Sequence, residues 1–561
     1  MLHLIYIYSH FQKITFFVLK LQKLLIYICL ILLGTRCAQI TPLTGGKKDT
    51  IPPKPLGFKP PNASLNFNSK VIEISFDEYI SLKDIANQFI ITPQTKETPE
   101  FSVTGKILKI TFNEDLIANT TYKLAFGNAI VDINEANVLQ NFEYIFSTGA
   151  SIDSLSVSGS VKNALNHKPS DQVLIALYDA LGNDSVIYKE KPLYITKTNS
   201  LGNFKINYLP NQFFKIVAIK DQNKNLLYDG SEEQIAFSDN LVNTNDSSQI
   251  DLLMFKEVPF KSFIKKSYSP EYGKAYVIFN KPQFNIRSVN SESLIHYQYS
   301  MNKDSLTLYY KDQFDTLKTI ISYGDLKADT ISIKILSQQL FEKELKNKNI
   351  KYDLRANFGT TLPIFLKPRF TLNVPIESSK ISDSKFTLIE KMDSSIKKIP
   401  FSILKNANWV TEFNLEANFK PETNYTMIIE RGAISNNSGR MNDSVSYQFK
   451  TTSEEDYAQL KLKIFLPKKE NYIVMLLNEK EDVVNETLIE CSLASTSERI
   501  VEYKNLLAGK YFIRVVEDAN KNGLFDAGEY FKKRQPETIY NNLFPIKLLA
   551  GWEIENEWIV K

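Results

Sequence analysis

The 561-residue chain is poor in the residues from which most catalytic and metal sites are built. It holds three cysteines, too few for a disulfide framework. Two of its four histidines, His3 and His10, fall in the apolar N-terminal segment, which leaves little material for histidine acid–base pairs or histidine-rich metal sites. Glycine is scarce, at 20 residues, and no glycine-rich phosphate loop is present. We therefore expect no enzyme activity and identify no small-molecule substrate.

Outside residues 1–36 the chain carries no formal net charge. Residues 1–36 hold four of the 67 Lys and Arg and none of the 63 Asp and Glu, so the rest is formally neutral. A neutral body has no general attraction for nucleic acid, and we expect no nucleic-acid partner. The composition, 43% apolar and 12% aromatic, is instead that of a globular, strand-rich protein. At about 100–200 residues per domain, the length predicts several domains.

The N-terminus has the pattern of an export signal. Lys20 and Lys23 precede the apolar run Leu24–Leu33, and Cys37 follows shortly after it. This arrangement resembles the lipobox of bacterial lipoproteins, which implies that Cys37 is diacylated and becomes the new N-terminus. Arg36 departs from the small residue that the family usually has there. The alternative is a retained transmembrane helix, although the run after Lys23 is short for a span of about 20 residues.

The residue after the lipidated cysteine also carries an expectation. Ala38 stands there, and the resemblance implies that a protein without Asp at this place reaches the outer membrane. The next residues are rich in Pro, Gly and Thr, which is typical of a tether. We therefore expect a lipid anchor to the outer membrane.

Alternation of apolar and polar residues with a period of two is common in the body. Val71–Phe76, Ile107–Phe112 and Tyr122–Phe126 are predicted to be half-buried strands. Turn residues separate such segments at short intervals, as in a β-sandwich. The best candidate for an amphipathic helix is Ile335–Lys348. The fold class predicted is all-β.

One segment occurs twice. Asn119-Thr-Thr-Tyr122 is followed by Tyr144-Ile-Phe-Ser-Thr148, and Thr423-Asn-Tyr425 is followed by Tyr447-Gln-Phe-Lys-Thr451. The interval from Tyr122 to Phe146 is 24 residues, as is that from Tyr425 to Phe449. This repeat predicts one Ig-like sandwich used twice.

The first copy resembles a known family. Phe76-Asp-Glu, Ile91-Thr-Pro93, Asp132-x-Asn134 and Phe146-Ser-Thr-Gly149 are similar to the bacterial Ig-like domain of the SbsA S-layer type. Together with Cys37 they resemble the Ig-like-domain lipoproteins common in Bacteroidota. The resemblance implies an exported cell-envelope protein, mostly without an assigned activity. Its motifs are packing and turn positions, so they indicate fold and not chemistry.

A second segment is also duplicated. Leu209 and Asp221 are 12 residues apart, as are Leu506 and Asp518, and an aromatic residue stands seven before the Asp in both. A strand running into an acidic turn is similar to prealbumin-like and carboxypeptidase-regulatory sandwiches. The expected organisation is a signal peptide (1–36), a lipidated Cys with a flexible tether (37–50), an Ig-like domain (51–149), a small prealbumin-like sandwich (150–256), a β-rich linker domain (257–351), a second Ig-like domain (352–452) and a second prealbumin-like sandwich (453–561).

The two acidic turns are candidate calcium loops. Their oxygen-bearing residues follow positions 1, 3, 5, 9 and 12 of an EF-hand-type loop, which wraps hard oxygens around one point. They are Asp518, Asn520, Asn522, Asp526 and Glu529, with Leu524 supplying its carbonyl, and Asp221, Asn223, Asn225, Asp229 and Glu232. Gly523 occupies position 6 of one loop and Leu226 that of the other. They resemble calcium loops in the B repeats of Sdr-type adhesins. The alternative is a polar hairpin turn, where Asp and Asn are favoured anyway.

A tripeptide of Asp, Ser or Thr, and an apolar residue recurs along the chain. It resembles the O-glycosylation sequon of exported Bacteroidota proteins, which implies glycans on Thr50, Ser154, Ser185, Ser305, Thr316, Thr330 and Ser444. Asp followed by Ser or Thr before a strand is also ordinary turn chemistry, so some copies are expected to be coincidental.

The function expected from these features is structural: a lipid-anchored scaffold of tandem β-sandwiches in the cell envelope, with envelope proteins as partners. The alternative is a carbohydrate-binding or adhesin module that recognises glycans. Trp409, Trp552 and Trp558 are the residues that could stack on a sugar, although a sandwich core is the more usual place for Trp.

Overall fold

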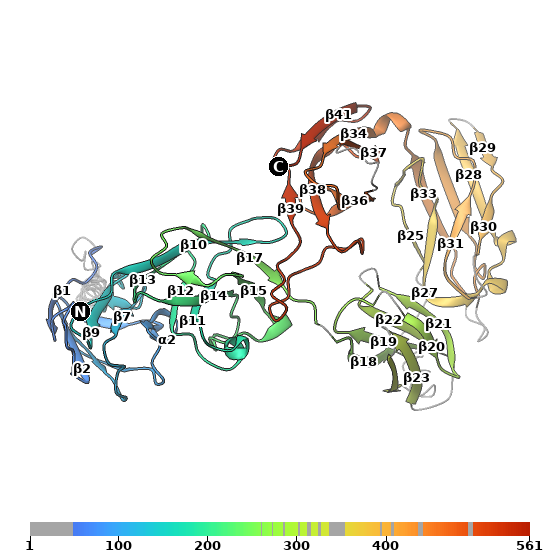
Figure 1. The fold of residues 1–561 in the computed structure, drawn as a ribbon. Helices are drawn as coiled ribbons and strands as arrows, with labels where there is room; N and C mark the ends of the chain where they lie inside the picture. The colour runs from blue at the N-terminus through green and yellow to red at the C-terminus, as the bar shows by residue number, and fades with distance from the viewer. Residues whose placement is uncertain are drawn as a thin grey trace, which may run out of the picture. The chain divides into compact units, whose positions relative to one another are not determined.

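The computed structural model describes residues 49–561 apart from 260, 272, 284–285, 301–302, 311–315, 324–326, 336–353, 393–394, 406–408, 436–440 and 492–497. These residues form strand after strand (Figure 1), and the predicted all-β class of tandem sandwiches is confirmed. One α-helix, α2 (Ile85–Gln88), occurs in the described part of the chain. The helix predicted at Ile335–Lys348 lies, except for Ile335, outside the described residues. Short 3₁₀ turns are η1 (Asp184–Tyr188), η2 (Gly230–Glu232), η3 (Ser378–Lys380), η4 (Asp383–Lys385) and η5 (Glu454–Asp456).

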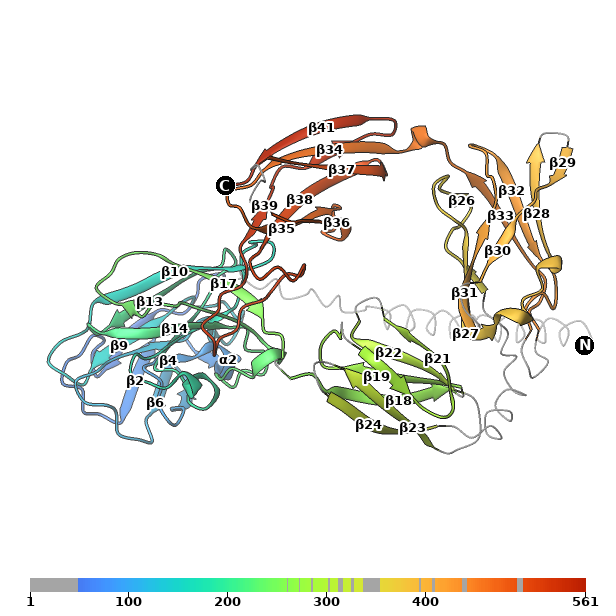
Figure 2. The ribbon, with the colours of Figure 1, turned by 45° about the vertical axis from the view of Figure 1, so that its right-hand side comes forward.

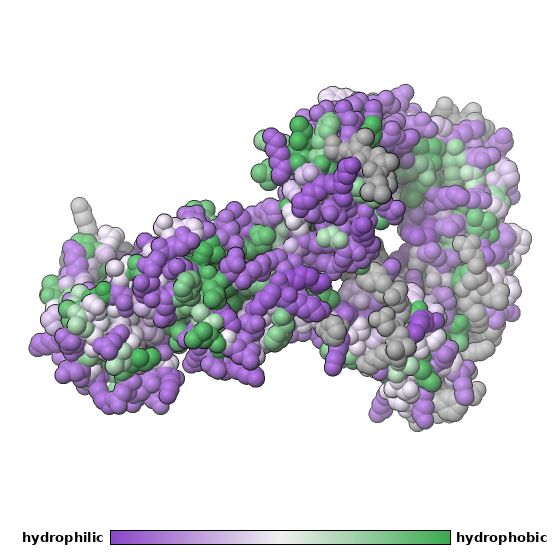
Figure 3. Space-filling view, viewed as in Figure 1, coloured by the Kyte–Doolittle hydropathy of each residue, from purple (hydrophilic) through white to green (hydrophobic). Residues whose placement is uncertain are grey.

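The chain divides into two compact units. The first is made of residues within 49–148, and the second of Gly149–Lys561 together with Ile91–Thr95 and Ala118–Tyr122. Between residues 150 and 561 four sandwich cores are separate clusters of buried apolar side chains. Figure 3 shows the consequence on one face, where hydrophilic residues predominate and hydrophobic ones are scattered among them.

The N-terminal Ig-like sandwich follows the predicted alternation. In β2 (Val71–Phe76) every second side chain is buried, because Ile72, Ile74 and Phe76 face the second sheet. One sheet has the order β1-β2-β6-β5 and the other β4-β7-β9, with β3 paired to β8. The bounds are β1 (Pro55–Lys59), β3 (Ile80–Leu82), β4 (Ile90–Thr92), β5 (Glu100–Thr104), β6 (Ile107–Thr111), β7 (Thr121–Ala125), β8 (Ile130–Asp132) and β9 (Glu143–Ser147).

The second Ig-like sandwich repeats this pairing. Its sheets have the orders β25-β27-β31-β30 and β26-β33-β32-β28-β29. The first matches β1-β2-β6-β5, and the middle three strands of the second match the reverse of β4-β7-β9, with β26 and β29 added at the edges. Tyr122 and Tyr425 are the second residues of the equivalent strands β7 and β32, and both are buried. The bounds are β25 (Leu354–Ala356), β26 (Thr361–Leu362), β27 (Arg369–Glu377), β28 (Phe386–Met392), β29 (Ser395–Lys398), β30 (Ser402–Leu404), β31 (Trp409–Glu416), β32 (Asn424–Ile429) and β33 (Val445–Thr451).

Tyr425 also carries a device known from Ig-like sandwiches. Its hydroxyl oxygen accepts the backbone N–H of Lys420 at 2.9 Å, which ties the loop before β32 to the start of the strand. The sequence repeat therefore reflects a structural repeat.

The first small sandwich has eight strands. Strand β10 pairs with β13 antiparallel and with β17 parallel, and β11 and β14 form the second layer with β12, β15 and β16. The bounds are β10 (Leu155–Asn163), β11 (Leu174–Asp179), β12 (Tyr194–Lys197), β13 (Asn203–Leu209), β14 (Phe213–Ile219), β15 (Gln234–Phe237), β16 (Val242–Asn243) and β17 (Ile250–Lys256).

The second small sandwich repeats the first, strand for strand. Strand β34 pairs with β37 antiparallel and with β41 parallel, and Figure 2 shows these three strands as one layer, with β36, β35, β38 and β39 in the other. The bounds are β34 (Ala458–Phe465), β35 (Asn471–Leu477), β36 (Val483–Ile489), β37 (Glu498–Leu506), β38 (Gly509–Asp518), β39 (Ile539–Asn541), β40 (Ile546–Leu548) and β41 (Glu553–Ile559).

The segment expected to be a β-rich linker has a core of its own. Its two sheets have the orders β18-β19-β22-β21 and β20-β23-β24, around buried residues such as Val277, Leu308 and Ile321. The bounds are β18 (Ile264–Glu271), β19 (Lys274–Phe279), β20 (Ile286–Asn290), β21 (Leu294–Tyr299), β22 (Ser305–Tyr310), β23 (Thr316–Tyr323) and β24 (Lys327–Lys334). Within the described residues, no helix has the length and apolar character needed to cross a bilayer.

Candidate functional site: two acidic turns

The C-terminal acidic turn begins at the last residue of β38. The carboxylate of Asp518 is fully buried and holds the turn together, because it accepts the backbone N–H groups of Asn522 (3.0 Å) and Gly523 (2.9 Å). Lys521 and Gly523 take left-handed φ values of 63° and 71°, which bend the chain back on itself. Asp518 therefore has a structural role in the turn whether or not a metal ion binds.

The side chains of Asn520 and Asn522 point their Nδ2 atoms toward Asp526. The Oδ1 atoms of Asn520 and Asn522 accept the backbone N–H groups two residues later, at 3.1 and 2.7 Å. Their Nδ2 groups donate to Oδ2 of Asp526, from Asn522 at 2.7 Å. Because an amide can turn by 180°, the same side chains can present oxygen to a cation at the expense of these hydrogen bonds.

The structure places a different glutamate beside the turn from the one expected at position 12. The carboxylate of Glu529 pairs with Lys532 at 3.1 Å and with Arg534 at 3.7 Å. Glu537 takes its place beside the turn and accepts the backbone N–H groups of Ala519 (3.0 Å) and Asp526 (2.9 Å). The reason is that the chain leaves the turn after Asp526 as a hairpin and returns only at Glu537.

The first acidic turn has the same construction. Oδ1 and Oδ2 of Asp221 accept the backbone N–H groups of Asn225 and Leu226 at 3.2 and 3.0 Å. Asn223 and Asn225 both donate their side-chain amides to Asp229. Leu226 takes the left-handed φ of 65° that Gly523 takes in the other turn, at a cost of about 1–2 kcal/mol for a residue with a Cβ.

Here too a different glutamate from the expected one lies beside the turn. Glu232 is largely exposed and lies 3.7 Å from Lys265, whereas Glu233 accepts the backbone N–H groups of Gln222 (2.9 Å) and Asp229 (3.2 Å). Glu233 and Glu537 are thus equivalent. The signal that sequence reasoning missed is a shared Glu-x-Ile at the start of the next strand, at residues 233–235 and 537–539.

The carboxylates of the C-terminal turn repel one another. Burial, with the charges of Asp526 and Asp518, raises the pKa of Glu537 above its usual value, against the lowering effect of the two N–H groups that it accepts. A bound cation would oppose this shift. Among the residues that the structure describes, however, no three His, Cys, Asp or Glu side chains are grouped so as to hold a metal ion by themselves. A calcium site here depends on the amide and backbone oxygens.

The remaining predicted sites are scattered. Cys37 lies outside the described residues. Of the hydroxyls in the recurring tripeptide, Thr50, Ser154, Thr330 and Ser444 are exposed, and Ser185, Ser305 and Thr316 are half-buried. Of the tryptophans, Trp558 packs against the core of the second small sandwich and Trp552 is 47% exposed.

Comparison with known proteins identifies part of the chain. Residues 49–148 match the family described as bacterial Ig-like domain. No curated protein matches the chain in sequence. The match covers the first Ig-like sandwich, whose strands and cores were described above.

The solved structures to which the chain is similar include three proteins that match it at 10–12% identity. The S-layer protein rSbsC(31-844) matches with a TM-score of 0.14 over 84% of this chain and 66% of that chain. The Bacillus anthracis TIE protein matches with a TM-score of 0.15 over 92% and 76%. A D312A variant of BcpA, the major pilin subunit of Bacillus cereus, matches with a TM-score of 0.14 over 73% and 99%.

Proposed function

We propose that this chain is a lipid-anchored cell-envelope protein with a structural role and no catalytic activity. The observation that carries the proposal is a body made of repeated β-sandwiches, one of which matches bacterial Ig-like domains, behind an apolar N-terminal run that is followed by Cys37. Sandwiches in tandem suit a protein that spans distance and carries load, because each of them has a hydrophobic core of its own.

Capture of partners from intact cells tests this role. The full chain is cross-linked in the membrane, solubilised in mild detergent and purified, and the co-purifying proteins are quantified by mass spectrometry. We expect the same envelope proteins in a constant ratio in independent preparations, because a scaffold has fixed neighbours. A glycan array is the opposing measurement. The control is Trp558→Phe, because Trp558 is partly buried against the core. Selective glycan binding that is lost in Trp552→Ala and kept in Trp558→Phe would favour an adhesin over a scaffold.

Calcium is the ion that we propose for the two acidic turns, with Glu537 and Glu233 in place of Glu529 and Glu232. The donors are hard oxygens: two Asp carboxylates, two Asn amides and one Glu in each turn. Extracellular modules bind calcium in the range of about 10⁻⁴–10⁻³ M, so turns of modest charge fill in millimolar calcium. The ion would add cross-links within a turn that already closes on Asp518 or Asp221.

Calcium is expected to raise the melting temperature of the full chain. Binding to the folded state alone stabilises by about 1.4 kcal/mol when calcium is at ten times its Kd. Glu537→Gln is expected to reduce this gain, and the matched variant Glu529→Gln to leave it unchanged, in calorimetry with millimolar calcium and with chelator. If the wild type melts identically in both conditions, the turns are closed by hydrogen bonds alone.

A further inference from the structure

The two acidic turns differ in the length of chain that follows them. Three residues separate Asp229 from Glu233, and ten, 527–536, separate Asp526 from Glu537. The extra residues form a hairpin in which Glu529 and Arg534 exchange backbone hydrogen bonds of 2.7 and 3.0 Å. Lys533 closes the hairpin with a left-handed φ of 51°. The second small sandwich thus carries an element that the first lacks.

One side chain of this hairpin, that of Tyr530, is buried against the first small sandwich, whereas residues 531–534 are exposed. Tyr530 is 1% exposed and belongs to the same apolar cluster as Tyr178, Tyr228 and Phe237. Its ring meets that of Phe237 edge-on, with 5.3 Å between the centroids. Next to it, the ring of Phe531 stacks on that of Tyr188 at 5.2 Å. Without the first small sandwich, the ring of Tyr530 would lie in water, as much of Phe531 already does at 59% exposed.

Polar contacts with the first small sandwich surround the buried side chain of Tyr530. The backbone N–H of Tyr530 donates to Oε1 of Glu257 at 2.6 Å, and Nζ of Lys533 lies 2.9 Å from Oδ1 of Asp184. Gln535 donates to Oδ1 of Asp239 at 2.8 Å. Every one of these acceptors belongs to the first small sandwich or to the residue directly after it. The hairpin is therefore fixed in both position and direction.

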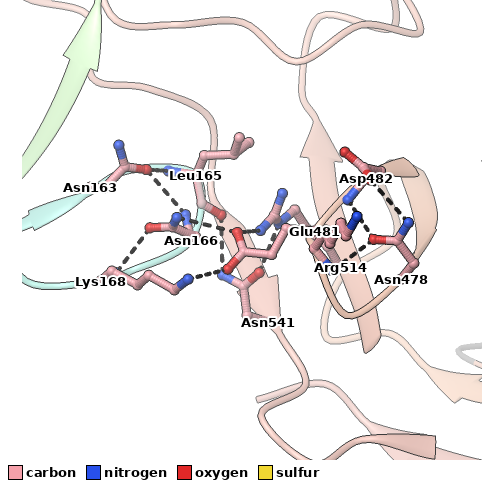
Figure 4. Close-up of polar contacts among 10 residues, drawn as sticks. Asn163, Leu165, Asn166, Lys168, Asn478, Glu481, Asp482, Arg514 and Asn541 are labelled. Atoms are coloured by element: carbon pink, nitrogen blue, oxygen red, sulfur yellow. Dashed lines mark hydrogen bonds and ion pairs between the residues drawn. The ribbon is translucent and has the colours of Figure 1, made fainter. Parts of the chain in front are cut away.

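A second set of contacts joins the same two sandwiches away from the hairpin (Figure 4). The carboxylate of Glu481 forms ion pairs with Lys168 and, at 3.5 Å, with Arg514. It also accepts a hydrogen bond from the side-chain amide of Asn166 at 3.3 Å. The side-chain amide of Asn541 donates to the carbonyl of Leu165 at 3.2 Å. The pKa of Glu481 lies below its usual value, mainly because Lys168 donates a hydrogen bond to the carboxylate.

We propose that the hairpin 529–534 is a clasp that fastens the second small sandwich to the first and closes residues 258–457 into a loop. The contacts join residues that are 273 and 376 positions apart, so chain connectivity does not impose them. Tension between the start of the first small sandwich and the C-terminus passes through the clasp, and the two domains in the loop carry it only after the clasp opens. This mechanical consequence rests on the proposed structural role, whereas the clasp itself does not.

The native ion pairs allow the clasp to be tested in the full chain without new cysteines. A zero-length carbodiimide is expected to couple Lys533 to Asp184 and Lys168 to Glu481, as read by mass spectrometry of the peptides. Coupling of Lys461 to Glu555, 3.2 Å apart within the second small sandwich, is the internal control. Mixing chains labelled with ¹⁴N and ¹⁵N separates coupling within a chain from coupling between chains.

Gly528→Ala is the variant that opens the clasp. A Cβ at Gly528 would lie 2.5 Å from the ring of Phe255 in the first small sandwich and 2.8 Å from the carbonyl of Arg534. We expect coupling of Lys533 to Asp184 to fall by about tenfold, with coupling of Lys461 to Glu555 unchanged. Gly509→Ala, whose Cβ has its nearest neighbour at 3.8 Å, should leave both unchanged. Tyr530→Ala provides a second opening variant.

Two results would contradict the clasp. One is the absence of a Lys533–Asp184 product in the wild type, and the other is a product whose two peptides always come from different chains. Pulling the full chain from its two ends tests the load path separately. In the wild type, the first extension step should be the opening of the clasp, which releases residues 258–457 while their domains stay folded. Gly528→Ala should lack this step. Identical traces would refute the load path even where the cross-link is present.

Discussion

Cys37→Ser is expected to leave a precursor that carries no fatty acid and keeps its signal segment. Acylation requires the thiol, since the thiolate is the nucleophile and a serine hydroxyl is far less acidic. A single acyl chain holds a protein only marginally, so stable attachment needs the several chains of a lipoprotein. The neutral body adds no electrostatic attraction to an anionic bilayer. Labelling of cells with an alkyne fatty acid and the apparent mass of the product measure both effects.

The matched control is Cys491→Ser, which removes a half-buried cysteine of the body and should keep full labelling. A third variant uses the departure from the usual lipobox. Arg36→Gly restores a small residue before Cys37 and should raise the processed fraction. Equal labelling of Cys37→Ser and the wild type would leave the retained transmembrane segment as the remaining explanation of the N-terminus.

Gly159→Ala is expected to destabilise the first small sandwich by about 3 kcal/mol or more. Gly159 lies in β10, opposite Ile250 of the parallel strand β17. A Cβ at this position would lie 2.0 Å from the carbonyl oxygen of Ile250 and 2.7 Å from the ring of Phe204. The first of these atoms is backbone, so relief requires β10 and β17 to move apart.

Calorimetry of the full chain measures this loss. For a domain of about 100 residues, the expected change lowers the melting temperature of that transition by roughly 10–20 °C. Gly359→Ala is the control, because a Cβ there meets no atom within 4 Å. If the two variants melted alike, β17 would not lie directly beside β10.

The strands were the most predictable feature of this protein. Alternation places Ile72, Ile74 and Phe76 on one face of β2, and the structure buries all three. The two repeats were predictable for the same reason, since equal spacing of aromatic residues reflects equal pairing of strands. The linker domain was identified only as β-rich, because its segments carry no repeat that relates them to another part of the chain.

The acidic turns were predictable in their first half only. Asp518, Asn520 and Asn522 are close in sequence, so their spacing alone places them in one turn. Glu537 comes eleven residues after Asp526, and a loop motif with fixed spacing selects Glu529 instead. Where a hairpin is inserted, distance along the chain no longer indicates distance in space.

The sequence by itself determined the all-β class and the twofold use of two sandwich types, because these follow from periodicity and spacing over short stretches. Only the tertiary structure decided which glutamate faces each turn and where Tyr530 lies. Residues 529–534 read as a polar turn with two aromatic residues. The burial of Tyr530 depends on Tyr178, Phe237 and Glu257, about 270–350 residues earlier, and no local pattern records such a contact.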